Sequence, residues 1–241
     1  MKSKTSIFVL FGLAALVAVE NSLGQGFGFY NFGANGGARA RVFGVEPDNP
    51  YRQLWGNGPE ASPPGTQTYS GTPLLGTNYN VEAWYSLTPA PDVFALNASA
   101  RPVQDSLTYF GFSEFPGFFS RGERYIPDAI FTPFPPGDPY MVYLQVRAWD
   151  NAGGRFPSWD QAWNAAQAGS GHAVGWSTTF EQGLSIGAST YPGLQNFQSF
   201  NLFIVPEPSA IALALLASLI LFGSLRTRPR RRQSSSPKIR R

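Results

Sequence analysis

Apolar and polar side chains alternate along two stretches of the chain, residues 79–87 and 140–149. Successive side chains of an extended strand point to opposite faces, so this alternation places the apolar ones together on one face. Such a pattern is typical of a sheet with one face packed on a hydrophobic core. The residues expected on that face are Val81, Ala83, Tyr85, Val142, Leu144, Val146 and Ala148.

Five further segments combine β-favouring residues with flanking glycine or proline, which commonly delimit short strands. Helices do not alternate with these strands as parallel βαβ units require. We therefore expect an all-β chain whose residues 25–204 form an antiparallel β-sandwich or jelly-roll-like domain. The five segments are Gly28–Phe32, Ala38–Val45, Leu107–Phe112, Ala173–Phe180 and Ser199–Val205.

One short helix is predicted to begin after Ser158. Ser158 and Gln161, three residues apart, form a capping-box pattern, and Gly169 is a typical C-terminal stop. Trp159 and Trp163 fall on one helical face. We expect this face to pack the helix onto the sheet. The alternative is a paired-tryptophan platform that contacts carbohydrate.

Two long segments rich in proline and glycine, residues 46–73 and 114–139, separate the predicted strands. They are too long to be simple hairpin loops. Their prolines and glycines fix turns without any functional cause. We expect these segments to wrap the edges of the sheet or to present a surface.

The first 24 residues have the organisation of a signal peptide. Lys2 and Lys4 give a cationic start, and an apolar run follows from Ile7 to Val19. This run is short for a membrane span but has the length of a signal-peptide core. We predict a signal helix cleaved before Gln25; an uncleaved anchor helix is the alternative.

Three parts follow one another at the C-terminus: Pro206-Glu207-Pro208, an apolar stretch over residues 210–225, and a basic run. The apolar stretch would span roughly 24 Å as a transmembrane helix, at about 1.5 Å per residue. The basic run stays cytoplasmic and stops transfer, which leaves the body of the protein outside the cytoplasm. The stop-transfer residues are Arg226, Arg228, Arg230, Arg231 and Arg232.

This three-part end resembles the PEP-CTERM sorting signal of Gram-negative bacteria, with residues 205–232 as the signal and 233–241 as a basic disordered tail. The resemblance implies that an exosortase, a membrane-embedded transpeptidase-like protease, recognises Pro206, Glu207 and Pro208. It also implies signal peptidase, the export machinery and the inner membrane as partners, and an association with exopolysaccharide. An ordinary single-pass anchor that is never cut is the alternative.

The body resembles extracellular PEP-CTERM proteins of Verrucomicrobia-like bacteria. The resemblance lies in a Val-x-Ala-Trp strand at 81–84, a Gln-Val-Arg-Ala-Trp-Asp strand end at 145–150, a Ser-Trp-x-x-Ala helix at 158–162 and a strand at 194–202. Those proteins have no established activity to carry over. The resemblance therefore implies an extracellular location for the protein, but it implies no catalytic activity.

The distribution of charge argues against nucleic-acid binding. The whole chain has a formal net charge of +3, but the excess of positive charge lies at its two ends. Residues 25–205 hold eight arginines and no lysine against thirteen Asp and Glu, a net charge of −5. A surface that binds a phosphate backbone is basic instead. Cysteine is absent, which excludes disulfides, thiolate metal sites and cysteine nucleophiles.

Candidate catalytic groups are sparse. The single histidine, His172, is a possible general base for Ser170 or Ser177, but no nucleophile-elbow pattern surrounds either serine. A pair of carboxylates could perform glycosidase chemistry if the fold held them about 5–10 Å apart. The acidic residues on or near predicted strands are Glu82, Glu114, Glu123 and Glu181.

Calcium is the one possible cofactor. Asp138, Asp150, Asn151 and Asp160 lie in or beside predicted loops and offer the oxygen ligands that calcium prefers. No EF-hand or repeat-type calcium motif occurs. Asp150 and Asn151, followed by two glycines, equally predict a turn after a strand.

Together these patterns predict a non-catalytic exported protein, anchored in the inner membrane as a precursor and then found at the cell envelope, the outer surface or outside the cell. The specific hypothesis is that exposed aromatic side chains bind or scaffold acidic or neutral exopolysaccharide. The alternative is a polysaccharide hydrolase or lyase that uses a carboxylate pair. A concave groove lined by two acidic residues and exposed tryptophan would favour the enzyme.

Overall fold

The computed structural model describes residues 25–96, 98–111, 115–127, 140–186 and 190–207. Most of their regular secondary structure is β-strand in a largely antiparallel arrangement, with a single α-helix, so the predicted all-β chain with one short helix is confirmed. Its sandwich-like or jelly-roll-like character stays a prediction. The expected signal helix and C-terminal transmembrane helix lie outside the described residues. Within those residues, no helix combines the length and apolar character needed to cross a membrane.

Eleven strands, one α-helix and two short 3-10 turns make up the described part of the chain. The helix is α2 (Trp159–Gln167), and the 3-10 turns are η1 (Ala34–Gly36) and η2 (Ala152–Gly154). The strands are β1 (Gln25–Tyr30), β2 (Val42–Phe43), β3 (Tyr79–Ser86), β4 (Arg101–Pro102), β5 (Thr108–Tyr109), β6 (Ser120–Ile126), β7 (Tyr140–Asp150), β8 (Ala173–Trp176), β9 (Phe180–Ile186), β10 (Phe200–Asn201) and β11 (Phe203–Ile204).

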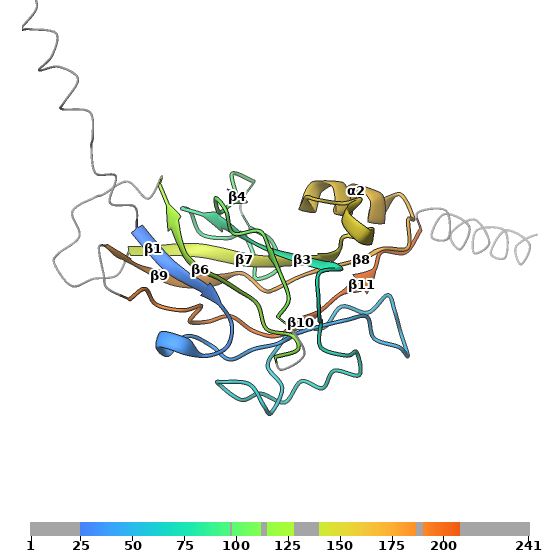
Figure 1. The fold of residues 1–241 in the computed structure, drawn as a ribbon, viewed down its shortest axis with the longest axis horizontal. Coiled ribbons are helices and arrows are strands. Elements are labelled where there is room, and N and C mark those ends of the chain that lie inside the picture. Colours follow the sequence, from blue (N-terminus) through green and yellow to red (C-terminus); the bar gives the residue numbers. More distant parts are fainter. Residues whose placement is uncertain (1–24, 97, 112–114, 128–139, 187–189, 208–241) are drawn as a thin grey trace, which may run out of the picture.

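Strand β7 is the centre of a curled sheet of nine strands. Strand β3 pairs along one edge of β7, while β9 and β8 pair with the first and second halves of its other edge. From β9 the sheet continues through β1 to β6. A bridge between Phe110 and Phe119 joins the segment after β5 to the segment before β6. The sheet therefore curls back toward its own far edge and encloses the core (Figure 1).

The alternating residues of β3 and β7 form the centre of the core, as predicted. The seven apolar residues expected on the inner face are at most 3% exposed. They pack with aromatic side chains from β1 and from the segment before β11, including Phe27, Phe29, Phe197 and Phe200. The opposite face of β7 is also covered in part, since Gln145 and Trp149 are 2% and 0% exposed.

The sequence predicted β3 and β7 but missed β9, which pairs with both β7 and β1. The strand expected over residues 173–180 contains β8 and only the first residue of β9. Residues 38–45 were expected to form one strand but contribute only β2 and isolated bridges. Strand β6 was not predicted, because its first five residues, Ser-Arg-Gly-Glu-Arg, contain no apolar side chain and four of its seven residues are exposed. Its pairing with β1 makes it a strand.

Helix α2 begins and ends at the residues that the sequence indicates. Ser158 is the N-cap residue by backbone geometry, although its side chain makes no capping hydrogen bond. At the other end, Gly169 has a φ of +80°. The amides of Gly169 and Ser170 donate to the carbonyls of Ala166 and Ala165. These two bonds form a Schellman motif, which explains the glycine.

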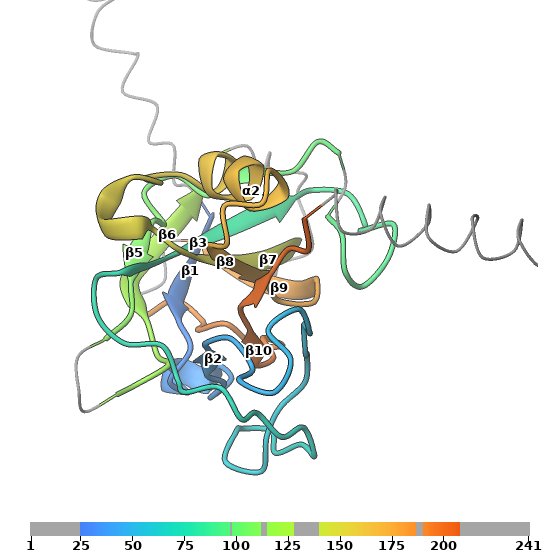
Figure 2. The same cartoon turned by 90° about the vertical axis from the view of Figure 1, so that its right-hand side faces the viewer.

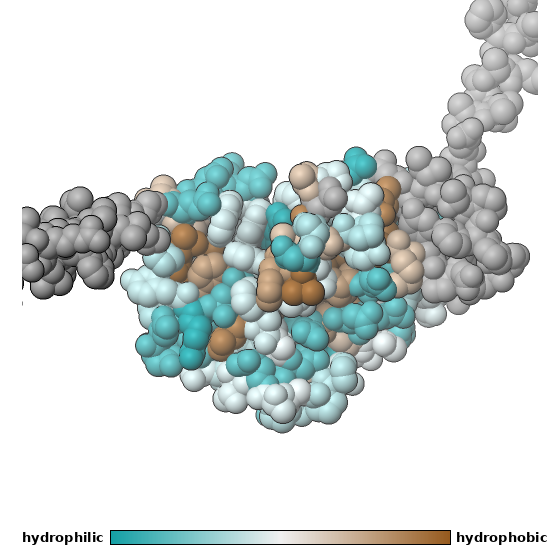
Figure 3. Space-filling model, turned by 180° about the vertical axis from the view of Figure 1, so that it is seen from behind, coloured by the Kyte–Doolittle hydropathy of each residue, from teal (hydrophilic) through white to brown (hydrophobic). Residues whose placement is uncertain are grey.

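The helix and the first long proline-rich segment lie on opposite sides of the sheet. Both cartoon views place α2 above the sheet and residues 46–73 below it (Figures 1 and 2). The lower segment is fixed by Glu46, which is fully buried and accepts hydrogen bonds from the amides of Ser70 and Gly71. Seen from behind, the surface carries separate hydrophobic patches among hydrophilic ones (Figure 3).

Candidate functional site

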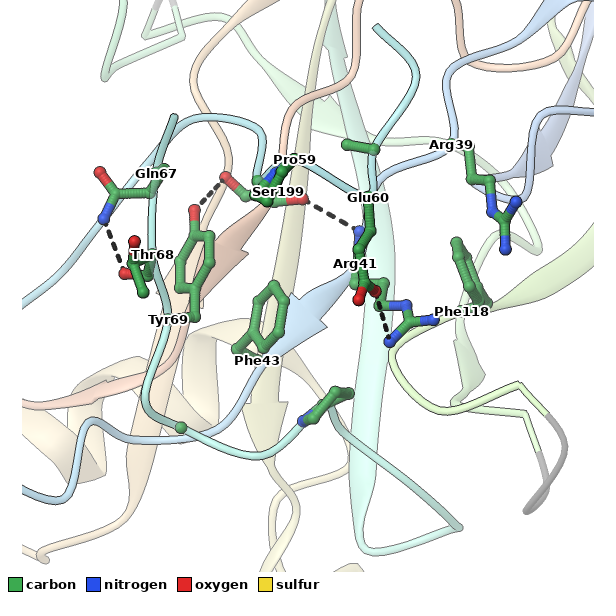
Figure 4. Close-up of a pocket in the computed structure, with 14 residues that line it drawn as sticks. Arg39, Arg41, Phe43, Pro59, Glu60, Gln67, Thr68, Tyr69, Phe118 and Ser199 are labelled. Carbon is green, nitrogen blue, oxygen red and sulfur yellow. Dashed lines mark hydrogen bonds and ion pairs between the residues drawn. The ribbon is translucent and has the colours of Figure 1, made fainter. Parts of the chain in front are cut away.

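A cavity of about 330 Å³ lies among the segments below the sheet. Its volume falls at the small end of the range usual for ligand-binding pockets. Side chains from residues 39–43, 58–73, Phe118 and Ser199 line it (Figure 4). We call it the arginine cavity, because Arg39 and Arg41 are the basic residues of its lining within the described part of the chain.

Alternation along residues 38–43 points the two arginines into the cavity. Ala38, Ala40 and Val42 are at most 2% exposed and belong to the core. Because side chains alternate along extended backbone, Arg39 and Arg41 point the other way. Arg39 exchanges two backbone hydrogen bonds with Ser62, and the amide of Arg41 donates to the Ser199 hydroxyl at 3.0 Å.

Phe118 provides an aromatic surface shared by both arginines. The guanidinium carbons of Arg39 and Arg41 lie 5.9 and 5.4 Å from the centre of its ring. These distances are within the range of cation–π attraction. The turn before Phe118 requires glycine: Gly117 has a φ of +80°, and a Cβ there would lie 2.9 Å from that of Arg41. This turn seats the ring beside the arginines.

A stacked pair of rings, Phe43 and Tyr69, forms the other side of the cavity (Figure 4). Their centres are 4.1 Å apart and their planes differ by 6°. The Tyr69 hydroxyl lies 2.8 Å from the Gly56 carbonyl and 2.9 Å from the Ser199 carbonyl, to either of which it can donate. Burial raises the pKa of Tyr69, and the charge of Glu46 adds to this. The ring is therefore a neutral, fixed wall.

The charges in the arginine cavity are incompletely balanced. Arg41 Nη1 lies 3.5 Å from Glu60 Oε2, and the Glu60 side chain is 78% exposed. An ion pair this exposed contributes little to stability, about 0–1 kcal/mol. Arg39 has no carboxylate within 4 Å among the residues that the structure describes. The cavity thus carries excess positive charge within a domain of net negative charge.

The two tryptophans named as possible carbohydrate contacts belong to a packed group above the sheet, and their contact with carbohydrate stays a prediction. Trp159 is 6% exposed and stacks on half-buried Trp163, with ring centres 5.9 Å apart. The prediction that they pack α2 onto the sheet is confirmed. We call the group the tryptophan cluster; it consists of Trp84, Trp149, Trp159, Trp163 and Trp176.

An arginine with two acidic neighbours lies inside the tryptophan cluster. The guanidinium of Arg147 is 3.9 Å from the ring centre of Trp84 and 5.2 Å from that of Trp159. Burial lowers the pKa of Arg147 to about 10, opposed by the charges of Asp160 and Glu82. Burial also raises the pKa of Glu82, although a 2.8 Å hydrogen bond from the Trp84 indole and the charge of Arg147 oppose the rise.

The structure does not bring His172 and a serine together as base and nucleophile. Nδ1 of His172 lies 3.1 Å from Asp150 Oδ2, and the ring packs edge-on against Phe156. The Ser170 hydroxyl faces only the backbone amide of His172, at 3.4 Å. Ser177 is fully buried, and its hydroxyl accepts from the amide of Val146. Among the described residues, the His172 ring therefore has Asp150 as its hydrogen-bond partner and neither serine.

The remaining acidic candidates are dispersed. Glu123 and Glu181 are exposed on β6 and β9. Of the calcium candidates, Asp150 contacts His172 and the amide of Ala152, and Asp160 lies in the first turn of α2. Glu114 and Asp138 fall outside the described residues. Over the described ranges, no three His, Asp or Glu residues form a group that could hold a metal ion.

The sorting motif begins where the described chain ends. Val205 packs against the tryptophan cluster, and the Glu207 side chain lies over Gly169 at the end of α2. Pro206 is described as well. Pro208, the apolar stretch and all five stop-transfer arginines lie outside the described residues.

Sequence reasoning did not identify the arginine cavity. A signal was present, because Ala38-Arg39-Ala40-Arg41-Val42-Phe43 alternates small or apolar residues with arginine and aromatic ones. That pattern predicts a shared face, but not that Phe118 and Tyr69 lie beside it. Comparisons with protein-family models, curated proteins and solved structures found no match. The candidate site is therefore defined by its own geometry and charge.

Proposed function

We propose that this chain is an exported, envelope-sorted, non-catalytic surface protein whose β domain binds exopolysaccharide in the arginine cavity. The C-terminal end acts as a PEP-CTERM signal in this proposal, with Pro206, Glu207 and Pro208 recognised by an exosortase. The sandwich-like domain is displayed at the outer surface or released. The cell's own extracellular matrix supplies the ligand.

The observation that carries this proposal is the lining of the cavity. Aromatic rings and guanidinium groups face a space of about 330 Å³. Aromatic rings offer apolar faces, and a small number of placed polar groups gives orientation, as is usual in ligand sites. The sole carboxylate in the lining is Glu60, which is paired with Arg41. Among the described residues, the cavity lining therefore holds one acidic side chain and not the pair that glycoside hydrolysis generally uses.

A hydrolase or lyase is the second candidate, and Glu82 favours it. Burial raises the pKa of this carboxyl group, and Asp160 is near enough to add to the rise. A raised carboxyl pKa beside a second acid is a feature of general acids. However, Glu82 accepts a hydrogen bond from Trp84 and lies beside Arg147, within the tryptophan cluster. These contacts favour a structural role for Glu82, as part of a network of charged and aromatic side chains that packs α2 on the sheet.

Sorting is tested by intact-mass analysis of the protein from its native envelope and medium. We expect a mass that lacks both the leader and the region after Pro206-Glu207-Pro208. A variant with these three residues replaced by alanine should keep its C-terminal region. Recovery of the wild-type chain with residues 210–241 still attached would leave a simple membrane anchor and overturn the sorting proposal.

Binding and catalysis are separated by incubating the purified full chain with the exopolysaccharide of its own cells. We expect the polymer to be retained without new reducing ends or unsaturated products. Loss of retention in a Phe118→Ala, Tyr69→Ala variant would locate binding in the cavity. Product formation that disappears in Glu82→Gln would establish the enzyme instead.

A further inference from the structure

The two arginines of the cavity differ in whether a carboxylate pairs with their guanidinium group. Arg41 faces the Glu60 carboxylate at 3.5 Å. Arg39 is exposed, and within the described ranges its guanidinium meets no carboxylate within 4 Å. Both groups lie over the same ring, Phe118. One guanidinium in the cavity is therefore free to bind an anion, and the other is only loosely occupied.

The position of these groups suits a planar anion. An arginine fork matches carboxylate geometry with two parallel hydrogen bonds, and stacking on an aromatic ring limits its motion. Arg39 and Arg41 are two residues apart on one extended segment, so both forks emerge on the same side. Glu60 shows that the cavity accommodates a carboxylate beside Arg41.

The rest of the lining suits a sugar ring better than a bare ion. Half-buried Phe43 and Tyr69 supply aromatic surface, and Pro59 and Pro73 add apolar surface. Phe118 is 5% exposed and lies beneath the two guanidinium groups, so it supports them more than it faces a ligand. Gln67 and Thr68 supply amide and hydroxyl groups that can bond to sugar hydroxyls. A ligand that contacts both the aromatic rings and the arginines would have a ring with an apolar face and a carboxylate attached to that ring.

We propose that the arginine cavity selects uronic-acid units of an acidic polysaccharide, with Arg39 and Arg41 binding the sugar carboxylate and Glu60 yielding its place beside Arg41. This inference rests on the proposed polysaccharide-binding function and specifies its ligand. Glu60 acts as an internal competitor, which keeps Arg41 paired until a sugar carboxylate replaces it. This competition lowers the affinity of the cavity for the sugar carboxylate. Because the interaction is between charged groups, binding of the sugar also weakens as salt concentration rises.

The test is calorimetric titration of the full-length chain in nonionic detergent with trigalacturonate and with its methyl ester. The ester keeps the rings and removes the charge. We expect the acid to bind about tenfold or more tightly than the ester, since hydrogen bonds to charged groups are worth roughly 1.5–3 kcal/mol. Arg39→Gln with Arg41→Gln should abolish this difference, because both positive charges are lost.

Two further variants control for folding and for general electrostatics. Arg155 is an exposed arginine over the ring of Phe156, outside the cavity lining, so Arg155→Gln should leave both affinities unchanged. Glu60→Gln should strengthen binding of the acid several-fold, a gain that misfolding cannot imitate. The basic residues after 225 contribute equally to every variant, so differences between variants report the cavity.

The outcomes separate this inference from the proposed function. Equal binding of acid and ester, lost in Phe118→Ala, would overturn the uronate selectivity and leave saccharide binding intact. Absence of binding by either ligand would overturn both. Binding of triglutamate as tightly as trigalacturonate would show that the cavity reads a carboxylate without the sugar, which also overturns the inference.

Discussion

Arginine lies over aromatic rings on both sides of the sheet, but the two regions use this contact differently. In the tryptophan cluster, Arg147 packs on Trp84 and Trp159, donates to Gln145 at 3.0 Å and has Glu82 and Asp160 as acidic neighbours. In the arginine cavity, Arg39 is exposed over Phe118 without an acidic partner among the described residues.

The difference lies in what surrounds the cation. The Arg147 guanidinium donates to Gln145 and lies over the rings of Trp84 on β3 and Trp159 on α2, so its contacts help to hold α2 on the sheet. A guanidinium over a ring beside an open cavity keeps donors available for a ligand. The tryptophan-rich region is therefore structural in this account, although tryptophan is the residue more often associated with sugar binding. The less conspicuous arginines are expected to carry recognition.

The largest expected effect is on stability, from Trp149→Ala. Trp149 is fully buried, and its indole donates to the Phe156 carbonyl at 2.8 Å. Its removal leaves a cavity and an unpaired carbonyl, so we expect the free energy of unfolding to fall by about 3–5 kcal/mol. Urea denaturation measures this. Trp163→Ala, at a half-buried position, is the control and should cost clearly less; equal losses would contradict the assignment of Trp149 to the structural centre.

The second test exchanges glutamine for one arginine in each region. Arg147→Gln leaves two acidic neighbours without their cation, and we expect it to lower the free energy of unfolding by about 2 kcal/mol. Arg39→Gln should change it by no more than about 0.5 kcal/mol, as is usual for exposed positions. Sugar affinity should follow the opposite order. If Arg147→Gln weakened binding more than Arg39→Gln, the two regions would have been assigned the wrong way round.

A smaller effect is expected where α2 ends. Gly169→Ala places a side chain at a φ of +80° and within 2.8 Å of Glu207 Cγ. We expect a loss of about 1–2 kcal/mol from the left-handed backbone alone. Gly171→Ala is the matched control, because Gly171 has a φ of +72° and open space around it. Thermal unfolding of both variants separates backbone strain from contact with Glu207; a stable Gly169→Ala would show that the motif does not close the helix.

The smallest expected effect concerns pH and Glu82. Its pKa in the folded chain is raised above 4.5 by burial, so the folded state retains this proton longer than the unfolded state. Its contribution to stability is therefore complete below pH 4.5 and is lost as pH rises through the raised value. Glu82→Gln should remove that decline. The difference between the wild-type and variant melting temperatures across this window is the measurement, and parallel curves would contradict it.

The sequence was informative where structure depends on local pattern. Alternation over 140–149 predicted β7 and its buried face, and Ser158 with Gly169 predicted both ends of α2. In contrast, β6 owes its strand conformation to pairing with β1, which no pattern in its polar residues records. Strands β3 and β7 and the helix were predictable because burial imposes a period on the chain, whereas β9, which lies between β7 and β1, was not predicted.

The candidate site was less predictable because tertiary contacts assemble it. Arg39 and Arg41 share a face by simple alternation, which the sequence contains. Phe118 and Tyr69 reach that face from segments far along the chain, and Gly117 is needed to seat the first of them. Trp159 and Trp163 attracted attention as a pair, but the sequence alone did not tell whether their faces were covered.

The most direct test of the contrast between the two regions is hydrogen–deuterium exchange of the full-length chain with and without saturating trigalacturonate. Slower exchange is expected in residues 39–43 and 58–73, which carry most of the cavity lining. Residues 159–176, which carry α2 and three members of the tryptophan cluster, should exchange unchanged. Protection confined to 159–176 would contradict the account and return carbohydrate binding to the tryptophans.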